Sequence, residues 1–242
     1  MIEKSNSARR GITGSALKMI AIISMFLDHF GVVMIENGIL KNQIGTAQTY
    51  WTLIDVFLRT AGRIAFPIFC FLLVEGFLHT RNVRRYGLRL LIFALISEIP
   101  FDLAIYGELF HMEYQNVFFT LFLGLWVIST YQKSYGDPLK QSLAIIAGCG
   151  ASVFLKSDYN IIGILMILIF YIFRENKKLQ TIFAGVLAAL ESLPCFGAAV
   201  LALIPIRLYN GERGNKNFKY AFYWFYPGHL LFLYVLSYFL IK

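Results

Sequence analysis

Apolar runs of near-membrane length recur along this chain, separated by short charged or turn-rich segments. A transmembrane helix needs about 20 mostly apolar residues, and a tilted or partial span needs fewer. The runs occupy residues 17–35, 62–78, 88–106, 117–131, 141–155, 160–173, 179–192, 194–206 and 220–241. This pattern predicts an all-α, polytopic integral membrane helix bundle of about nine transmembrane helices, within a range of about eight to ten.

Composition supports this fold class. Of the 242 residues, 58% are hydrophobic and 15% are charged, and the mean hydropathy is +0.63, which is far more apolar than an ordinary soluble domain. We see no internal repeat or low-complexity tract, so we expect a single transmembrane domain over residues 1–242. The three cysteines lack metal-ligand spacing, and no metal site is expected.

Basic residues cluster in alternate loops. If the N-terminus is cytoplasmic, most of the 22 Lys and Arg residues fall in cytoplasmic segments, whereas joining residues 179–206 into one span weakens this bias. We therefore expect nine spans, a cytoplasmic N-terminus and an outer C-terminus. Topology explains the net charge of +8, so no nucleic-acid partner is expected.

The first run, Leu17–Met34, contains three ionisable side chains: Lys18, Asp28 and His29. At 100° per residue, Lys18 and His29 share one helix face, roughly 16 Å apart along the axis. Lys18 alone could snorkel to the membrane surface. Asp28 and His29 lie too deep for both to snorkel, so they indicate a functional site or, alternatively, helix–helix hydrogen bonding.

The segment between the first two runs and the run that follows it carry further polar groups. Tyr50–Arg59 is typical of an amphipathic interfacial helix or of an ordinary connecting helix. Pro67 is expected to bend the second span, and Glu75 places a carboxylate near its inner end, where a site residue or a local pair with Arg81 would fit.

Carboxylates near the outer side form a second group of candidates. Glu98 and Asp102 are four residues apart on one helix face, which implies a nearby cation or a raised pKa. Arg59 or Arg63 could be that cation. Asp158 precedes a span, where helix capping competes with a role in a site.

A basic, glycine-containing loop precedes the last run. It reads YNGERGNK and includes Arg213 and Lys216, and His229 lies in the aromatic run that follows. Such a loop offers backbone N–H groups and cations to phosphates, although a cytoplasmic loop would look similar.

Seven segments, in order, resemble the TraX family: ALKMIAIISMFLDHFG, GRIAFPIFCFLLVEGF, SEIPFDLA, NVFFTLFLGL, DYNIIGIL, YNGERG and KYAFYWFYPGHLL. At superfamily level the chain is similar to membrane acyltransferases that include the acyltransferase-3 proteins and heparan-α-glucosaminide N-acetyltransferases. Lys18 and His29 match the basic-x10-His pattern of acyltransferase-3 proteins, with Lys where Arg is usual.

The resemblance implies transfer of an acyl group, most simply acetyl, from cytoplasmic acetyl-CoA to an amine or hydroxyl of an acceptor at or across the membrane. TraX itself is associated with N-terminal acetylation of conjugative pilin, and a bacterial cytoplasmic membrane is implied. The acceptor class stays open among a peptide, a glycan and a small molecule, and the oligomeric state stays open too.

Acyl transfer needs a base near neutral pKa, and His29 is our candidate, either as base or as a covalent acyl carrier. Asp28, its neighbour, is the second catalytic candidate, but it lies 100° around the helix, so a carboxylate from another span, such as Glu98, Asp102 or Asp158, could orient the His29 ring instead. The candidates for binding acyl-CoA are Lys18, Arg63, Arg213 and Lys216. The candidates for binding the acceptor are Glu75, Glu98, Asp102, Asp158 and His229.

Two other function classes fit the same pattern. Buried acids, a histidine and proline-interrupted helices would also suit a transporter or proton-coupled carrier, although inverted repeats are not evident. A structural membrane partner would show neither substrate flux nor CoA binding.

Overall fold

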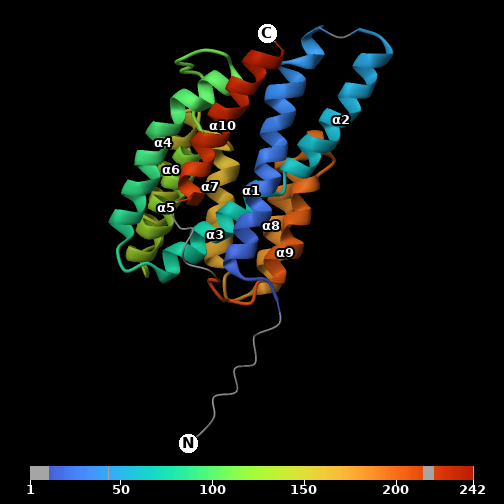
Figure 1. The fold of residues 1–242 in the computed structure, drawn as a ribbon. Coiled ribbons are helices and arrows are strands. Elements are labelled where there is room, and N and C mark those ends of the chain that lie inside the picture. The colour runs from blue at the N-terminus through green and yellow to red at the C-terminus, as the bar shows by residue number, and fades with distance from the viewer. Residues whose placement is uncertain (1–10, 43, 215–220, 242) are drawn as a thin grey trace, which may run out of the picture.

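The computed structural model describes residues 11–42, 44–214 and 221–241, and within these ranges the chain is helical, with isolated β-bridges and no strand. The chain runs up and down along one direction, and its described ends lie at opposite ends of the molecule (Figure 1). The α-helices are α1 Gly14–Phe30, α2 Thr46–Gly62, α3 Ala65–His79, α4 Val83–Ile105, α5 Val117–Lys133, α6 Pro138–Phe154, α7 Asn160–Ile172, α8 Lys177–Glu191, α9 Leu203–Arg207 and α10 Ala221–Leu240.

The apolar runs predict most of these helices closely, with two exceptions: α2, which falls between the first two runs, and the region after α8. The run at 194–206 is not one helix but two 3₁₀ segments, Leu193–Cys195 and Ala198–Ala202, followed by the short α9. Phe196 and Gly197 adopt left-handed backbone angles, with φ of 57° and 72°, and Pro194 lacks a backbone donor. These residues turn the chain sharply after α8.

Helix α2 includes the segment Tyr50–Arg59, which was predicted as an interfacial or a connecting helix. It is longer than Tyr50–Arg59 and packs along α1 and the π-helical turn Gly31–Glu36 that extends α1. Gly62 permits this approach, because a Cβ there would collide with Asp28, and the Ser24 hydroxyl donates to the carbonyls of Ala61 and Gly62 at 2.6 and 3.0 Å. The end of α2 is therefore fixed beside the middle of α1.

The expected bend at Pro67 takes another form. The chain breaks at Arg63 and Ile64, between α2 and α3, and Pro67 lies in the first turn of α3, where its missing N–H has no helical partner to lose. Pro100 and Pro227, by contrast, lie inside α4 and α10 without ending them.

Small residues allow the other helices to pack closely. A Cβ on Gly124 would meet Ile167, one on Gly148 would meet Val127, and one on Gly163 would meet Thr120. These contacts join α5, α6 and α7, as small residues commonly do between membrane helices.

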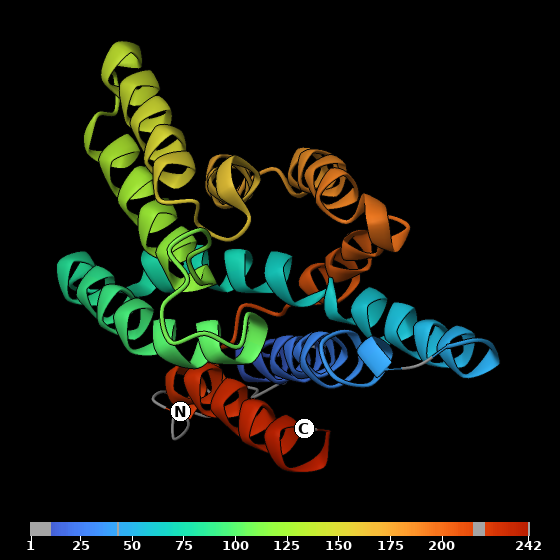
Figure 2. The same cartoon turned by 90° about the horizontal axis from the view of Figure 1, so that it is seen from above.

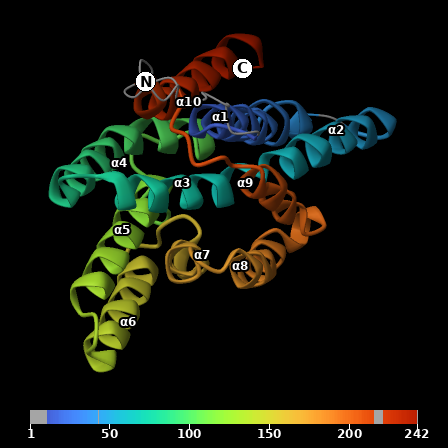
Figure 3. The ribbon, with the colours of Figure 1, turned by 90° about the horizontal axis from the view of Figure 1, so that it is seen from below.

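Helix α3 lies between two groups of helices. In the views along the long direction, α1, α4 and α10 lie on one side of it, and α5 to α9 lie on the other (Figures 2 and 3). Helix α10 packs on α4 and α1, and α3 packs on α1, α5 and α7. The space bounded by α1, α3, α4 and α10 is the one that contains the candidate site.

Two helical stretches among the described residues, Gly14–Lys41 and Thr46–His79, are long and apolar enough to cross a membrane. Shorter apolar helices occupy Val117–Lys133, Asn160–Ile172 and Ala198–Arg207. By length and composition, the strongest membrane signal thus belongs to the N-terminal third of the chain.

Candidate functional site

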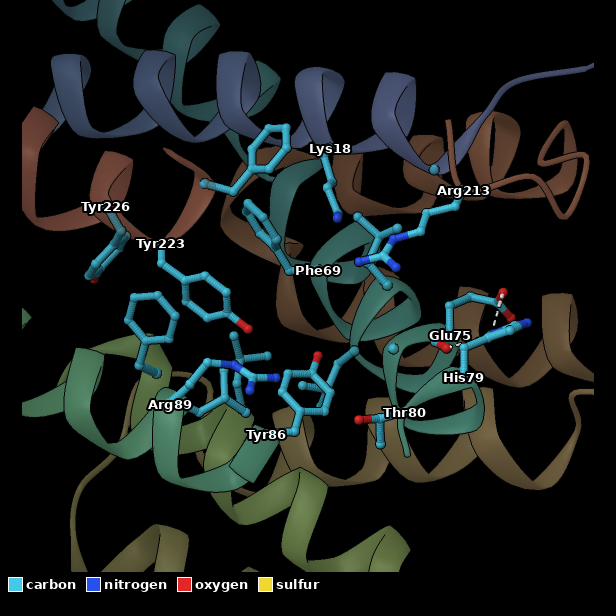
Figure 4. A pocket seen from close by; sticks show the side chains of 18 of the residues that line it. Lys18, Phe69, Glu75, His79, Thr80, Tyr86, Arg89, Arg213, Tyr223 and Tyr226 are labelled. Atoms are coloured by element: carbon cyan, nitrogen blue, oxygen red, sulfur yellow. Dashed lines mark hydrogen bonds and ion pairs between the residues drawn. The ribbon is translucent and has the colours of Figure 1, made fainter. Parts of the chain in front are cut away.

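A cavity of about 680 Å³ lies between α1, α3, α4, α10 and the segment 209–213. Figure 4 shows Lys18, Arg89 and Arg213 directed into the same hollow from three different elements. Arg81 also lines the cavity, and Glu75 is the one carboxylate among the lining residues. The volume is typical of a small-molecule site, and the excess of cations favours an anionic ligand.

Backbone pairing fixes the mouth of this cavity. The segment after α9 runs against the start of α1: Ile12 N–H donates to the Leu208 carbonyl at 2.8 Å, and Gly14 N–H donates to the Glu212 carbonyl at 2.8 Å. Ser15 N–H donates to the Arg213 carbonyl at 3.1 Å. This pairing holds the loop that carries Arg213 against the start of α1, through a contact between residues 198 positions apart in sequence.

The loop at 209–213, which was predicted to offer backbone N–H groups and cations to phosphates, pairs with the start of α1. Its Asn210 N–H donates to the Ile12 carbonyl at 3.0 Å, and the Glu212 N–H donates to Asn210 Oδ1 at 2.9 Å, whereas Arg213 lines the cavity. Lys216, the other cation predicted for this loop, lies outside the described residues.

Arg89 is the clearest sign that the cavity suits an anionic ligand. Its Nε is buried and has no hydrogen-bond acceptor among the described residues, while its guanidinium stacks over Tyr86 at 5.5 Å. Lys18 similarly lies over the Phe222 ring at 5.2 Å. Because a buried donor without an acceptor is costly, an anion in the cavity would complete this arrangement.

Glu75 and Tyr209 form a hydrogen-bonded pair in the cavity wall. Burial and the Glu75 charge raise the pKa of Tyr209 to about 12, so Tyr209 keeps its proton and acts as the donor. Glu75 also lies 4.0 Å from His79 Nδ1, and the structure shows no pair with Arg81. The local pair predicted for Glu75 therefore has a different partner.

Met25, Phe118 and Tyr226 close the deep end of the cavity. His29 is one helical turn beyond Met25, and its ring meets the Tyr226 ring edge-on at 5.9 Å between centroids. His29 itself is not among the lining residues. Lys18 and His29 thus share a face as predicted, but one side-chain layer separates the cavity from the imidazole.

His29 forms a hydrogen-bonded pair with His229 of α10. His29 Nδ1 and His229 Nε2 are 2.7 Å apart, and His229 Nδ1 lies 2.7 Å from the Phe225 carbonyl oxygen. A carbonyl can only accept, so His229 carries its proton on Nδ1, and its Nε2 must accept from His29 Nδ1–H. Neutral His29 therefore keeps the lone pair on Nε2, which is the atom a general base uses.

The histidine pair corrects the expected source of orientation for His29. A carboxylate from another span was expected, but the partner is His229, which had been placed in the acceptor site. Nothing in the spacing of residues 29 and 229 indicates this contact, because it depends on how α10 packs against α1.

Asp28 belongs to a separate group of charges, here called the ion cluster: Asp28, Glu36, Arg59, Arg63 and Glu191. Asp28 Oδ2 lies 2.8 Å from Arg59, and Asp28 Oδ1 lies 2.9 Å from Arg63. Arg63 also reaches Glu191 at 3.4 Å, and Arg59 reaches Glu36 at 3.2 Å. Arg63, predicted as a cofactor-binding residue, belongs to this ion cluster and is absent from the cavity lining.

The remaining predicted acids lie elsewhere. Glu98 accepts from Asn116 Nδ2 at 2.5 Å, and Asp102 accepts from the His111 backbone N–H at 2.8 Å. Neither acid pairs with Arg59 or Arg63, whose carboxylate partners are those of the ion cluster.

Asp158 lies in the turn before α7, and its carbonyl accepts from the Thr120 hydroxyl. Burial raises the pKa of its side chain to about 7. The N-cap residue of α7 is Tyr159, which makes no side-chain capping bond, and the Asp158 carboxyl accepts from the Tyr159 backbone N–H just before the helix.

Over the described residues, fold and site together define an all-helical protein with two helical stretches long and apolar enough to cross a membrane and a cation-lined cavity beside a histidine pair. A family model described as "TraX protein" matches residues 13–237, and the chain belongs to the TraX family. This result confirms the family suggested by the sequence segments.

One relative is the "Probable fimbrial assembly protein FimC, serogroup H1" of Dichelobacter nodosus. It is 31% identical over 242 residues, which cover 90% of this chain and 92% of that protein. No solved structure matches the chain.

Proposed function

We propose that this protein is a multi-pass membrane acyltransferase that uses cytoplasmic acyl-CoA, most simply acetyl-CoA. The observation that carries the proposal is the cation-lined cavity that ends one side-chain layer from the His29–His229 pair. Helix α1 therefore contributes Lys18 to a cavity that could hold a long, anionic acyl donor, and it carries the candidate base His29 further along.

The membrane arrangement follows from the surface and the loops. Large apolar side chains face outward from many helices, among them Phe57 at 70% exposed, Phe154 at 86% and Phe239 at 78%. Water would disfavour such a surface, whereas lipid would cover it. We assign the Lys18 and Arg213 end to the cytoplasm, since basic loops gather there, and nine passes place the C-terminus outside.

The cavity has a cationic end and an aromatic end, and these suit the phosphates and the pantetheine arm of acyl-CoA. The cations Lys18, Arg89 and Arg213 would bind the phosphates, and the aromatic deep end at Phe118 and Tyr226 would hold the apolar part of the pantetheine arm. Met25 is a flexible side chain, and its movement would open the last layer to His29.

In the reaction, the acceptor amine or hydroxyl attacks the thioester carbonyl carbon, and His29 Nε2 takes the acceptor proton. His229 Nε2 accepts from His29 Nδ1–H throughout, so it holds the ring and stabilises the imidazolium that forms. The carbon–sulfur bond then breaks, and the proton on His29 passes to the departing CoA thiolate. Atoms and charges balance without a further reactant.

For the acceptor, we propose a pilus or fimbrial subunit presented at the membrane. The D. nodosus relative is named for fimbrial assembly, and an extracytoplasmic subunit would reach His29 from the side opposite the cation-lined mouth. The carboxylates Glu98, Asp102 and Asp158 are the candidates for acceptor contacts on that side.

The direct test is transfer of label from acetyl-CoA to a candidate acceptor by purified, membrane-reconstituted protein. His29→Ala should lower transfer by about 10²–10⁴-fold, the factor that a positioned base supplies. His111→Ala is the matched control, since His111 stacks on Tyr106 at 3.8 Å and does not line the cavity. Normal transfer by a folded His29→Ala protein would contradict the proposal, and substrate flux without CoA would favour a transporter.

A further inference from the structure

A second pocket, of about 300 Å³, lies beside the main cavity. Its cations come from three places: Arg174 after α7, Lys177 at the start of α8 and Arg207 at the end of α9. Glu75 is its one carboxylate among the lining residues. Cations from separate elements thus converge on one hollow.

Two of these cations have no counter-charge. Among the described residues, neither Lys177 nor Arg207 forms an ion pair, whereas Arg174 pairs with Glu175 at 3.6 Å and stacks on Tyr171 at 4.8 Å. Gln180 at the pocket floor donates to the Phe170 carbonyl at 3.0 Å, which holds that wall in place. The pocket therefore has a fixed wall and two cations available to an anion.

The second pocket shares a wall with the main cavity. Glu75, Tyr209 and Gly211 line both hollows. The two hollows therefore adjoin along these residues. One long polyanion could occupy both spaces at once.

We propose that this second pocket binds a phosphate ester through Lys177 and Arg207. Two sources share this chemistry: the nucleotide end of the acyl-CoA whose arm lies in the main cavity, or the headgroup of an anionic phospholipid. The first source rests on the proposed function. The CoA source would account for cations in the second pocket as well as in the main cavity, because the nucleotide of CoA carries a 3′-phosphate apart from its diphosphate.

The test compares Lys177→Gln/Arg207→Gln with Arg84→Gln/Arg85→Gln. Arg84 and Arg85 are exposed, lie on the same predicted cytoplasmic side and line neither hollow, so both variants lose two positive charges from that side. Binding of CoA, of 3′-dephospho-CoA and of adenosine 3′,5′-bisphosphate is measured on full-length protein in nanodiscs of neutral or anionic lipid.

For the CoA source, the wild-type and control proteins should bind CoA about tenfold more tightly than 3′-dephospho-CoA, and the Lys177/Arg207 variant should lose this preference. If the ligand is instead a lipid headgroup, the wild-type protein should not prefer CoA over 3′-dephospho-CoA. Anionic lipid should then compete for the pocket and weaken the binding of adenosine 3′,5′-bisphosphate to the wild-type protein but not to the Lys177/Arg207 variant. Either result supports the phosphate site.

The proposal is overturned if the Lys177/Arg207 variant matches the control with all three probes in both lipids. The bisphosphate separates this outcome from failure of the proposed function, because it lacks the pantetheine arm. Bisphosphate binding that needs Lys177 and Arg207, in a protein that does not bind CoA, would keep the pocket and refute the acyltransferase.

Discussion

The ion cluster and the main cavity both place several charges inside an apolar helix bundle, yet they are built differently. In the ion cluster, Asp28 forms ion pairs with both Arg59 and Arg63, and each arginine also pairs with a second carboxylate. The cavity instead has four cations and one carboxylate among its lining residues, around an open volume. Paired charges fix helices together, whereas an excess of one sign around a hollow prepares a binding site.

The largest expected difference between the two regions is in stability. Arg63→Ala should lower the free energy of unfolding by about 3–5 kcal/mol, because it leaves Glu191 buried without a partner and leaves Asp28 with Arg59 alone. Arg89→Gln, in the cavity, should change unfolding little and weaken CoA binding about tenfold. Thermal unfolding in detergent and CoA titration of both variants measure this. If Arg63→Ala and Arg89→Gln lower the free energy of unfolding equally, the proposed difference between the ion cluster and the cavity is wrong.

The next effect concerns the side-chain layer between the cavity and His29. Met25→Phe should block the route and lower acetyl transfer by about 10²-fold, since a small misplacement of reacting groups has a large cost, while CoA still binds. Met25→Leu keeps a similar volume and serves as control. If Met25→Phe transfers acetyl at the wild-type rate, the route does not pass this layer.

His229 should act as a positioning residue for His29. His229→Leu removes the acceptor for His29 Nδ1–H and should lower transfer roughly tenfold or more, a part of the factor that a positioned base supplies. His229→Gln offers an amide oxygen and should recover part of the rate. The rate-versus-pH profile should shift in the Leu variant. An unchanged profile with a lower rate would indicate a packing role only.

The smallest expected effect is at Glu75, the carboxylate shared by the two hollows. Glu75→Gln removes a negative charge beside the anion and keeps an oxygen that accepts from Tyr209, so CoA binding should tighten by a few-fold. CoA titration at low and moderate salt measures this. Weaker binding would show that Glu75 contacts the ligand directly.

The sequence predicts the helices well because apolar length and turn residues are local signals. Helix α5, at Val117–Lys133, matches the run at 117–131, and α10 matches the last run. The sequence also indicates the turn after α8, between the runs at 179–192 and 194–206, but the second run forms 3₁₀ segments and the short α9 in place of one α-helix. Apolar composition alone does not distinguish these two kinds of helix.

The site is predicted only in part. Lys18 and His29 share a helix face by periodicity, and Arg213 reaches the same cavity as Lys18. The pairing of His29 with His229, and of Arg63 with Asp28, depends on how separate helices pack, and one sequence without its relatives contains no signal for these contacts. Arg89 was missed because it resembles an ordinary topology-setting arginine.

The most direct measurement is a map of the reconstituted protein with bound acetyl-CoA. The account predicts that the phosphates lie among Lys18, Arg89 and Arg213, and that the thioester reaches the Met25–Tyr226 layer next to His29 Nε2. A map in which acetyl-CoA binds elsewhere, or a titration in which it does not bind, would contradict the central claim.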